Sequence, residues 1–452
     1  MTTEVPQPLA EQLRVHRQDH VLRWWGELKS AERDALARQL AEIDLDQLDR
    51  AWQQITGQDE REESPAERAR RAAAPRQLVR VAHSDADRRE WSEARAAGGG
   101  LLRAGRVGAV LVAGGEGSRL GFPHPKGQFP IGPVSAKPLF QLFAEQLRAR
   151  ARAAGARIPW YVMTSDSTHD ETVDFFRQHA AFGMDPRDVH FFRQGAMPAV
   201  DRQTGRLLMA SRHELVLNPD GHGGFLAALD RSGLLDQMCD AGIDYVYYHQ
   251  VDNPLARVCD PAFLGFHLRM GSEVSTKVVA KLSPEERMGV AVELDGRTQI
   301  IEYSDLPHDM AAERDAAGEL KFWAGSTAIH VFSRSFLERL RAARIELPFH
   351  RAIKAVPHID DAGALVEPKA ENAIKFERFI FDVLPLAERS LVVEARRDDE
   401  FCPLKNKSGD FSAEHVKRSL SELYAGWLRS AGATIPEQAT VEISPLYAFD
   451  PD

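Results

Sequence analysis

Arg119 and Lys126 lie in a glycine-rich stretch, LVAGGEGSRLGFPHPKGQFPIG, that covers residues 111–132. An apolar run begins the stretch, so we expect a strand that leads into a glycine loop. Glycines let backbone N–H groups approach an anion, arginine offers a permanently charged planar fork, and lysine offers a compact charge. The stretch therefore predicts a loop that binds phosphate.

Two common nucleotide-binding patterns do not fit this loop. A dinucleotide fingerprint begins at Gly115 and Gly117, but position 120 is leucine and the next glycine is Gly121. A P-loop needs Gly-Lys-Ser/Thr, whereas residues 125–128 read Pro-Lys-Gly-Gln. An NAD-dependent oxidoreductase is therefore disfavoured. The alternative to a phosphate-binding loop is a set of ordinary turns with a surface arginine. The prolines around Lys126 stiffen the loop and argue against this alternative.

Asp252 is the carboxylate best placed to meet a metal ion. It follows the strand-like YVYYHQV, so it emerges at the carboxyl end of an expected strand. Mg²⁺ prefers oxygen ligands and keeps waters, so one carboxylate plus phosphate oxygens is a sufficient set. On spacing alone, an ordinary Asp-Asn-Pro turn explains the residue equally well. The neighbouring His249 is expected to be a packed histidine rather than a ligand.

Other polar and basic residues occur beside expected turns. NPDGHGG at 218–224 is a tight glycine turn, and the amide of Gln194 is able to match the edge of a pyrimidine. Lys375 and Lys405 are further cations able to meet an anion, and Glu302 is a carboxylate after a strand-like run. Each also has a plain alternative: a turn, a surface glutamine, solvated lysines and a strand-end glutamate.

From Val107 onward, short β-branched runs alternate with amphipathic stretches. The strand-like runs are VGAVLVAGG, WYVMTS, VHFFRQ, YVYYHQVDN and VSTKVVAK, and the helical ones include KPLFQLFAEQLRARARAAG and THDETVDFFRQHAAF. This alternation predicts an α/β fold with a mostly parallel sheet and helices on both faces. Ligands of such sheets bind at the carboxyl ends of the strands.

The pattern differs on either side of this region. Apolar residues at helical spacing over 21–55 predict two helices, and the charged stretch 59–76 predicts an exposed helix or linker. Ala-Ala-Gly-Gly-Gly at 96–100 is expected to be a flexible joint. A helix near 413–430 and the strand-like VEISPLYAFD follow residue 390. We therefore expect an N-terminal helical extension and linker at 1–100, a catalytic domain at 101–390 and a small C-terminal α/β domain at 391–452.

The composition is that of an ordinary globular protein. The chain has 452 residues, 43% apolar and 27% charged, which is enough for a large core in two or three domains. A formal net charge of -10 argues against an extended nucleic-acid-binding face. Its three cysteines lack metal-binding spacing, which predicts reduced and mostly buried thiols. We see no signal peptide or membrane span, and expect a cytoplasmic monomer or weak homo-oligomer without nucleic-acid or membrane partners.

With SAKPLFQLFAEQL behind it, GGEGSRLGFPHPKGQFPIG resembles the signature of the UTP:sugar-1-phosphate uridylyltransferases, especially the eukaryotic-type UDP-N-acetylhexosamine pyrophosphorylases. Similar segments follow in order, among them FFRQGAMPA, NPDGHGG, QVDNPL, GVAVELDGRTQIIEYSDL, IKFERFIFD, EFCPLKN and EISPL. The similarity covers nearly the whole chain, with weak stretches at 59–100 and 311–319. It implies a Rossmann-like, glycosyltransferase-A-like sheet and the conversion of UTP and a sugar 1-phosphate to a UDP-sugar and pyrophosphate, with Mg²⁺.

The resemblance also implies roles for single residues. The positions that match the family's nucleotide site are Gly114, Gly115, Gln194, Gly221 and His222. The positions that match its catalytic cations and its metal-binding aspartate are Arg119, Lys126, Lys375 and Asp252. The positions that match its contacts to the sugar or the sugar phosphate are Gly289, Glu302, Tyr303, Ser326 and Lys405.

The sequence departs from the acetylhexosamine pattern at the sugar positions. Residues 324–330 read AGSTAIH where that pattern has AGNxANH, so Ser326 and Ile329 replace asparagines. His222 stands where asparagine is usual and is more like the glucose-type enzymes. We favour N-acetylglucosamine 1-phosphate as the substrate. A glucose-type or broad UDP-sugar uridylyltransferase and a non-catalytic nucleotide-sugar-binding regulator remain alternatives, and the retained cations and aspartate argue against the regulator.

Overall fold

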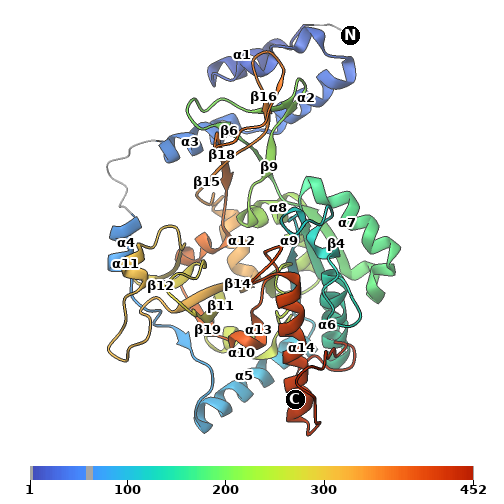
Figure 1. The fold of residues 1–452 in the computed structure, drawn as a ribbon, viewed down its shortest axis with the longest axis vertical. Coiled ribbons are helices and arrows are strands. Elements are labelled where there is room, and N and C mark those ends of the chain that lie inside the picture. The colour runs from blue at the N-terminus through green and yellow to red at the C-terminus, as the bar shows by residue number, and fades with distance from the viewer. Residues whose placement is uncertain (1–3, 57–64, 451–452) are drawn as a thin grey trace. The chain divides into compact units, whose positions relative to one another are not determined.

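The computed structural model describes residues 4–56 and 65–450, and the contacts within it divide the chain into two compact units. The small unit combines three separate segments, Met1–Glu62, Gln194–Gly224 and Glu346–Ile380. The large unit combines Glu63–Arg193, Phe225–Ile345 and Phe381–Asp452. Each unit therefore assembles segments that are far apart in the sequence, as the colours of Figure 1 show.

Helices at the N-terminal end of the chain form one part of the small unit. They are α1 (Gln7–Val15), α2 (Ser30–Glu42) and α3 (Leu45–Thr56). Helices α2 and α3 confirm two helices within 21–55, whereas Asp19–Leu22 and Trp25–Glu27 form short 3₁₀ turns and α1 was not expected. Trp24 and Trp25 are buried in this unit's core, as packing residues should be. The strands of the unit are short: β5 (Ala196–Pro198), β6 (Val200–Asp201), β7 (Met209–Ser211), β8 (Glu214–Leu215), β9 (Leu217–Pro219), β15 (His350–Lys354), β16 (His358–Ile359), β17 (Leu365–Val366) and β18 (Ala373–Glu377).

The large unit is built on one sheet, which has ten strands within the described part of the chain. Its strands are β1 (Leu78–Val79), β2 (Val107–Val112), β3 (Trp160–Thr164), β4 (Val189–Arg193), β10 (Tyr245–Gln250), β11 (Val274–Ala280), β12 (Val290–Leu294), β13 (Arg297–Ile301), β14 (Ala324–Ser333) and β19 (Ser390–Glu394). The main path runs β1-β19-β11-β14-β10-β2-β3-β4, and the β12–β13 hairpin joins at β14.

Most neighbours along this path are parallel, and β14 is antiparallel to both β11 and β10. The expected α/β fold with a mostly parallel sheet is confirmed. Strands β10, β2 and β3 are adjacent and parallel, so their carboxyl ends lie at one edge of the sheet. Because these strands are buried on both faces, their sequences are continuous apolar runs, such as VGAVLV in β2. This edge carries the glycine loop after β2 and Asp252 after β10.

Helices from many parts of the chain accompany this sheet in the large unit (Figure 1). They are α4 (Pro65–Arg71), α5 (Asp85–Arg103), α6 (Leu139–Ala154), α7 (Asp166–Gln178), α8 (Phe225–Arg231), α9 (Leu234–Asp240), α10 (Pro261–Arg269), α11 (His308–Ala311), α12 (Arg334–Ala342), α13 (Arg397–Glu400) and α14 (Ala413–Ser430). Helix α6 ends at Gly155, a left-handed glycine that terminates helices without steric cost.

The flexible joint expected at 96–100 is wrong, because these residues lie inside helix α5. A Cβ built on Gly98 would meet the carbonyl oxygen of Pro261 at 1.9 Å, and one on Gly265 would meet that of Ala94 at 1.7 Å. Helices α5 and α10 therefore pack backbone against backbone, which only glycine permits. The expectation was wrong because a glycine tract that permits close helix packing cannot be distinguished by composition from one that forms a flexible joint.

The compact units also differ from the expected segments 1–100, 101–390 and 391–452. Strand β19 follows the expected boundary closely, yet it pairs with β11 inside the main sheet. Within 441–450 the structure has no strand, so the strand expected in VEISPLYAFD is wrong. Side-chain bonds hold this segment instead: the Glu442 carboxylate accepts from the backbone N–H groups of Val134 and Ser135 at 2.7 and 2.8 Å. Of the stretch 59–76, residues 59–64 lie outside the described residues, and Pro65–Arg71 forms a helix.

The cysteines and the helices bear on two further expectations. Cys239, Cys259 and Cys402 are free thiols, two of them buried. Among the described residues, no helix has both the length and the apolar character needed to cross a membrane.

Candidate active site

The loop after β2 folds back on itself as a short hairpin. The Lys126 N–H donates to the Gly115 carbonyl at 3.0 Å, and the Gly117 N–H donates to the His124 carbonyl at 2.9 Å. Glycine is required at two points of this turn. A Cβ on Gly117 would lie 2.7 Å from the Phe122 carbonyl oxygen, and one on Gly127 would lie 2.1 Å from the Phe140 ring. The hairpin is thus a fixed structure, and it presents Lys126 at the edge of the sheet.

Gly114 and Gly115 lie at the start of the loop. Ser165, the residue after β3, donates its hydroxyl to the Gly114 carbonyl at 2.9 Å and so fixes this backbone. Gly115 is exposed, and a Cβ built on it meets no atom within 4 Å. Packing within the described residues therefore does not demand a glycine at 115. The backbone at Gly115 is therefore open to close approach from solvent.

The structure brings three predicted cations together at this edge. Burial lowers the pKa of Lys126, and the positive charges of Lys405 and Arg119 lower it further, whereas Asp252 raises it. Lys126 donates to the Leu404 carbonyl at 3.4 Å, and neither Arg119 nor Lys405 forms an ion pair with a described residue. Like charges held close together repel one another, and an anion placed among them relieves the repulsion.

Asp252 lies at the end of β10, beside these cations. Its backbone carbonyl accepts from the Leu404 N–H at 2.6 Å, and its carboxylate accepts no hydrogen bond from a described residue. The carboxylate oxygens are therefore available to a hard cation. In the described part of the chain no three His, Cys, Asp or Glu side chains cluster as a metal site. A single carboxylate fits a metal such as Mg²⁺ that takes its other ligands from phosphates and water.

Three of the predicted sugar residues come together in the large unit. The Ser326 N–H in β14 donates to the Gly289 carbonyl at 2.8 Å. A Cβ on Gly289 would lie 2.7 Å from a Glu302 carboxylate oxygen, so glycine makes room for that side chain. Tyr303 follows, 48% exposed. Ile329, which replaces an asparagine of the family pattern, is buried in the core and does not line this surface.

The small unit positions Gln194, Gly221 and His222. Strands β5 and β9 pair, and beyond them the Asp220 N–H donates to the Gly195 carbonyl at 3.0 Å, which places Gln194 beside the Gly221 turn. Gly221 has a φ of +85°, and a Cβ there would lie 2.4 Å from the Arg378 carbonyl oxygen, so this turn requires glycine. Gln194 is buried, which removes the surface-glutamine alternative.

His222 and Lys375 belong to the same part of the small unit. The Ile380 N–H donates to Nδ1 of His222 at 3.1 Å, and the His222 ring stacks on Phe379 with 5.3 Å between centroids. Lys375 lies in β18, three residues before Arg378, whose N–H donates to the Asp220 carbonyl at 2.7 Å. The strand that carries Lys375 therefore leads directly to the glycine turn.

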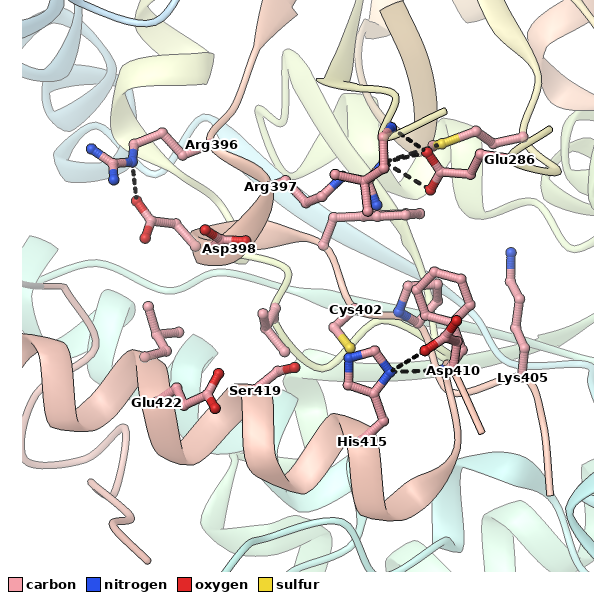
Figure 2. Close-up of a pocket in the computed structure, with 18 of the residues that line it drawn as sticks. Glu286, Arg396, Arg397, Asp398, Cys402, Lys405, Asp410, His415, Ser419 and Glu422 are labelled. Carbon is pink, nitrogen blue, oxygen red and sulfur yellow. Dashed lines mark hydrogen bonds and ion pairs between the residues drawn. The ribbon is translucent and has the colours of Figure 1, made fainter. Parts of the chain in front are cut away.

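Lys405 also lines a cleft of about 1090 Å³ in the large unit. Figure 2 shows Lys405 at one end of this cleft and Arg396 and Asp398 at the other. Most of its charges are paired: Arg397 with Glu286 at 2.8 Å, and His415 with Asp410 at 3.7 Å. Of the predicted site residues, Lys405 lines this cleft.

Sequence reasoning missed three contributors to the edge. Lys407 approaches the loop, because a Cβ on Gly121 would lie 3.8 Å from its Cε. The Leu404 carbonyl holds Lys126, and Asn253 is buried next to Asp252. The basic run CPLKNK weakly indicates a role for Lys407, whereas no sequence pattern indicates a role for a backbone carbonyl such as that of Leu404. His249 is fully buried, packs edge-on against Phe143, and has a pKa lowered to about 3 by burial, which confirms a packed histidine.

A mostly parallel sheet with a glycine hairpin, clustered cations and a carboxylate at its carboxyl edge is the arrangement of nucleotide-binding α/β proteins. Residues 64–439 match the family described as UTP--glucose-1-phosphate uridylyltransferase. The chain belongs to this family and is a uridylyltransferase.

Individual relatives extend the match to nearly the whole chain. The chain is 36% identical to the human UDP-N-acetylhexosamine pyrophosphorylase-like protein 1, over 96% of this chain and 90% of that protein. It is 37% identical to the UDP-N-acetylglucosamine pyrophosphorylase of Saccharomyces cerevisiae, over 76% and 74% of the two chains. The crystal structure of the Trypanosoma brucei uridine diphosphate N-acetylglucosamine pyrophosphorylase is 27% identical and superposes with a TM-score of 0.83 over 100% of this chain and 94% of that one.

Proposed function

We propose that this uridylyltransferase converts UTP and N-acetylglucosamine 1-phosphate to UDP-N-acetylglucosamine and pyrophosphate. The observation that carries the proposal is the cluster of Arg119, Lys126 and Lys405 beside Asp252 at the carboxyl edge of the sheet. In this reaction two anions approach each other, and an anion-binding surface of this kind offsets their repulsion.

The chemistry requires alignment more than proton transfer. A phosphate monoester with a second pKa of about 6 is largely ionised at neutral pH, so its oxygen attacks the α-phosphorus of UTP without a general base. Arg119 and Lys126 hold the triphosphate and take up the charge that grows on the departing pyrophosphate. Lys375 and Lys405 offset the charge of the incoming sugar phosphate.

Asp252 would hold Mg²⁺, with phosphate oxygens and water as the other ligands. When bound, the ion neutralises charge on the phosphate oxygens and helps to align them. The Asp252 carboxylate, which accepts no hydrogen bond from the described residues, supports this assignment. A Mg²⁺ titration of the Asp252→Ala variant tests it: an unchanged titration removes Asp252 from the site.

The remaining predicted residues divide into a group that binds the nucleotide and a group that binds the sugar. Gly114, Gly115, Gln194, Gly221 and His222 bind the uracil and ribose, and the exposed backbone at Gly115 supports this. Gly289, Glu302, Tyr303 and Ser326 bind the sugar. We also propose that the sheet is Rossmann-like and glycosyltransferase-A-like, and that the protein works in the cytoplasm as a monomer or weak homo-oligomer.

The choice of sugar rests on the relatives. The acetylglucosamine enzymes of Saccharomyces cerevisiae and Trypanosoma brucei match at 37% and 27% identity, whereas the UDP-glucose phosphorylase of Trypanosoma brucei matches at 17%, which shows the fold alone. Ser326 and His222 differ from the acetylhexosamine pattern and make a direct test necessary.

The test is pyrophosphate release from UTP and Mg²⁺ with 1-phosphates of N-acetylglucosamine, N-acetylgalactosamine, glucose and galactose. We expect the highest kcat/KM with N-acetylglucosamine 1-phosphate. A preference for glucose 1-phosphate would replace the proposed substrate. Tight UTP binding without release from any sugar would identify a regulator instead.

A further inference from the structure

Asn253, the residue after Asp252, is 3% exposed, and both ends of its side-chain amide are bonded to one segment of chain. Its Nδ2 donates to the Glu400 carbonyl at 2.7 Å, and its Oδ1 accepts from the Cys402 N–H at 3.1 Å. The amide of Asn253 therefore bonds to Glu400 and Cys402 as the backbone of a neighbouring β-strand would.

The segment that Asn253 holds is the one that organises the cations. Two residues past Cys402, the Leu404 N–H donates to the Asp252 carbonyl at 2.6 Å. The Leu404 carbonyl accepts from Lys126 Nζ at 3.4 Å, and Lys405 comes next. Three consecutive bonds therefore align residues 400–404 with Asp252 and Asn253, and the far end of this alignment contacts Lys126.

The other end of the segment is anchored in the core. Glu400 is 6% exposed, and its carboxylate accepts from Lys277 Nζ, which also donates to Asp260 at 2.7 Å. Glu400 is therefore fixed from two sides, by its carboxylate in the ion cluster and by its carbonyl at Asn253. Beyond residue 405 the chain turns back, and the Lys405 N–H donates to the Phe411 carbonyl at 2.8 Å.

We propose that Asn253 is a positioning residue for uridylyl transfer: it clamps residues 400–404 and thereby sets the spacing of Asp252, Lys126 and Lys405. The inference rests on the proposed function. Replacing the amide leaves the Glu400 carbonyl and the Cys402 N–H without these bonds, so the segment gains freedom although every side chain that would touch substrate is still present. A small displacement of catalytic groups costs up to about 100-fold in rate.

The chain contains a matched control. The amide of Asn372 forms the same pair of bonds with one segment of the small unit: Nδ2 donates to the Val356 carbonyl at 3.1 Å, and Oδ1 accepts from the Val356 N–H at 2.8 Å. Asn372 belongs to none of the proposed binding groups. Asn253→Ala and Asn372→Ala thus remove the same chemistry from two places.

The experiment compares full-length wild type, Asn253→Ala and Asn372→Ala at a temperature where all are folded by circular dichroism. We expect Asn253→Ala to lower kcat by roughly 10- to 100-fold, to need more Mg²⁺ for half-maximal rate, and to exchange the amide hydrogens of residues 402–404 faster. Asn372→Ala should match the wild type in all three. If the alanine variant does not fold, Asn253→Asp is measured instead; it keeps the shape and the acceptor oxygen, but replaces the amide donor with a charged carboxylate oxygen.

The outcomes separate the two proposals. An active wild type with an equally active Asn253→Ala overturns the clamp and leaves the proposed function standing, even if exchange is faster. An equal loss in Asn372→Ala also overturns it, because the effect would then be a general loss of stability. A wild type that releases no pyrophosphate with any sugar phosphate overturns the proposed function, and the clamp's role in it as well.

Discussion

Two groups of charged side chains in the large unit are built in opposite ways. Lys277 is 1% exposed and pairs with the carboxylates of Asp260 and Glu400, which are themselves buried. Burial alone would lower the pKa of Lys277, but the two carboxylates hold it above its ordinary value. At the edge of the sheet, burial lowers the pKa of Lys126; Asp252 raises it, and the cations Lys405 and Arg119 lower it further.

The difference shows which group maintains the fold and which waits for a ligand. Buried charges persist only when they are paired, so the Lys277 cluster is complete in itself. Cations that lie together beside one carboxylate gain most from an added anion. The comparison predicts that substitutions in the first group lower stability and that substitutions in the second lower activity.

The largest expected effect is on stability, from Lys277→Met. This change removes the one lysine that contacts both buried carboxylates, which costs about 3–5 kcal/mol in the free energy of unfolding. Urea unfolding of the variant and the wild type measures the difference. A loss below about 1 kcal/mol would show that the buried ion cluster is not needed for the fold.

Next come Arg119→Ala and Lys126→Ala, which should fold normally. Each removes a cation that stabilises the pyrophosphate as it departs, so kcat should fall by about 10²- to 10³-fold. Steady-state assays measure this, with Lys369→Ala, an exposed lysine in the small unit, as the control. Wild-type rates in both variants would remove the cluster from catalysis.

A third prediction concerns pH, through His267. Its ring bonds to the Ser275 and Ser333 hydroxyls at 2.8 and 3.0 Å, and burial lowers its pKa to about 3. The unfolded chain titrates near 6.5, so protonation favours unfolding as pH falls below 6.5, and the stability is fully present only above that value. Between pH 7 and 5 this histidine should cost about 2 kcal/mol.

The measurement is urea unfolding at both pH values for the wild type and His267→Gln. The variant should lose less stability between pH 7 and 5 than the wild type does. Equal losses would mean that another group accounts for the acid sensitivity.

The smallest effect is expected for Gly115→Ala. A Cβ at this position meets nothing within 4 Å, so the melting temperature should not change. The methyl group would occupy the surface on which the nucleotide lies, and KM for UTP should rise about tenfold, which corresponds to about 1.4 kcal/mol. Gly127→Ala, where the Phe140 ring is 2.1 Å away, is the contrasting variant and should be unstable. An unchanged KM for Gly115→Ala would place the nucleotide elsewhere.

The sequence predicts local features of this molecule better than distant ones. The strand before the glycine loop and the position of Asp252 at a strand end follow from short apolar runs, because backbone geometry repeats over a few residues. Asn253 carried no such signal, since its partner Glu400 is 147 residues away. The glycines at 98–100 were misjudged for a related reason: the helix that requires Gly98 to be small is α10, far along the chain.

The most direct test of the cation cluster is the binding of pyrophosphate, measured by calorimetry with Mg²⁺ for wild type, Lys126→Ala and the exposed control Lys369→Ala at a temperature where all are folded. We predict that the wild type and Lys369→Ala bind pyrophosphate with similar affinity and that Lys126→Ala binds it at least about tenfold more weakly, a loss of about 1.4 kcal/mol or more. Equal binding by Lys126→Ala and the wild type would contradict the assignment of the triphosphate to this edge of the sheet.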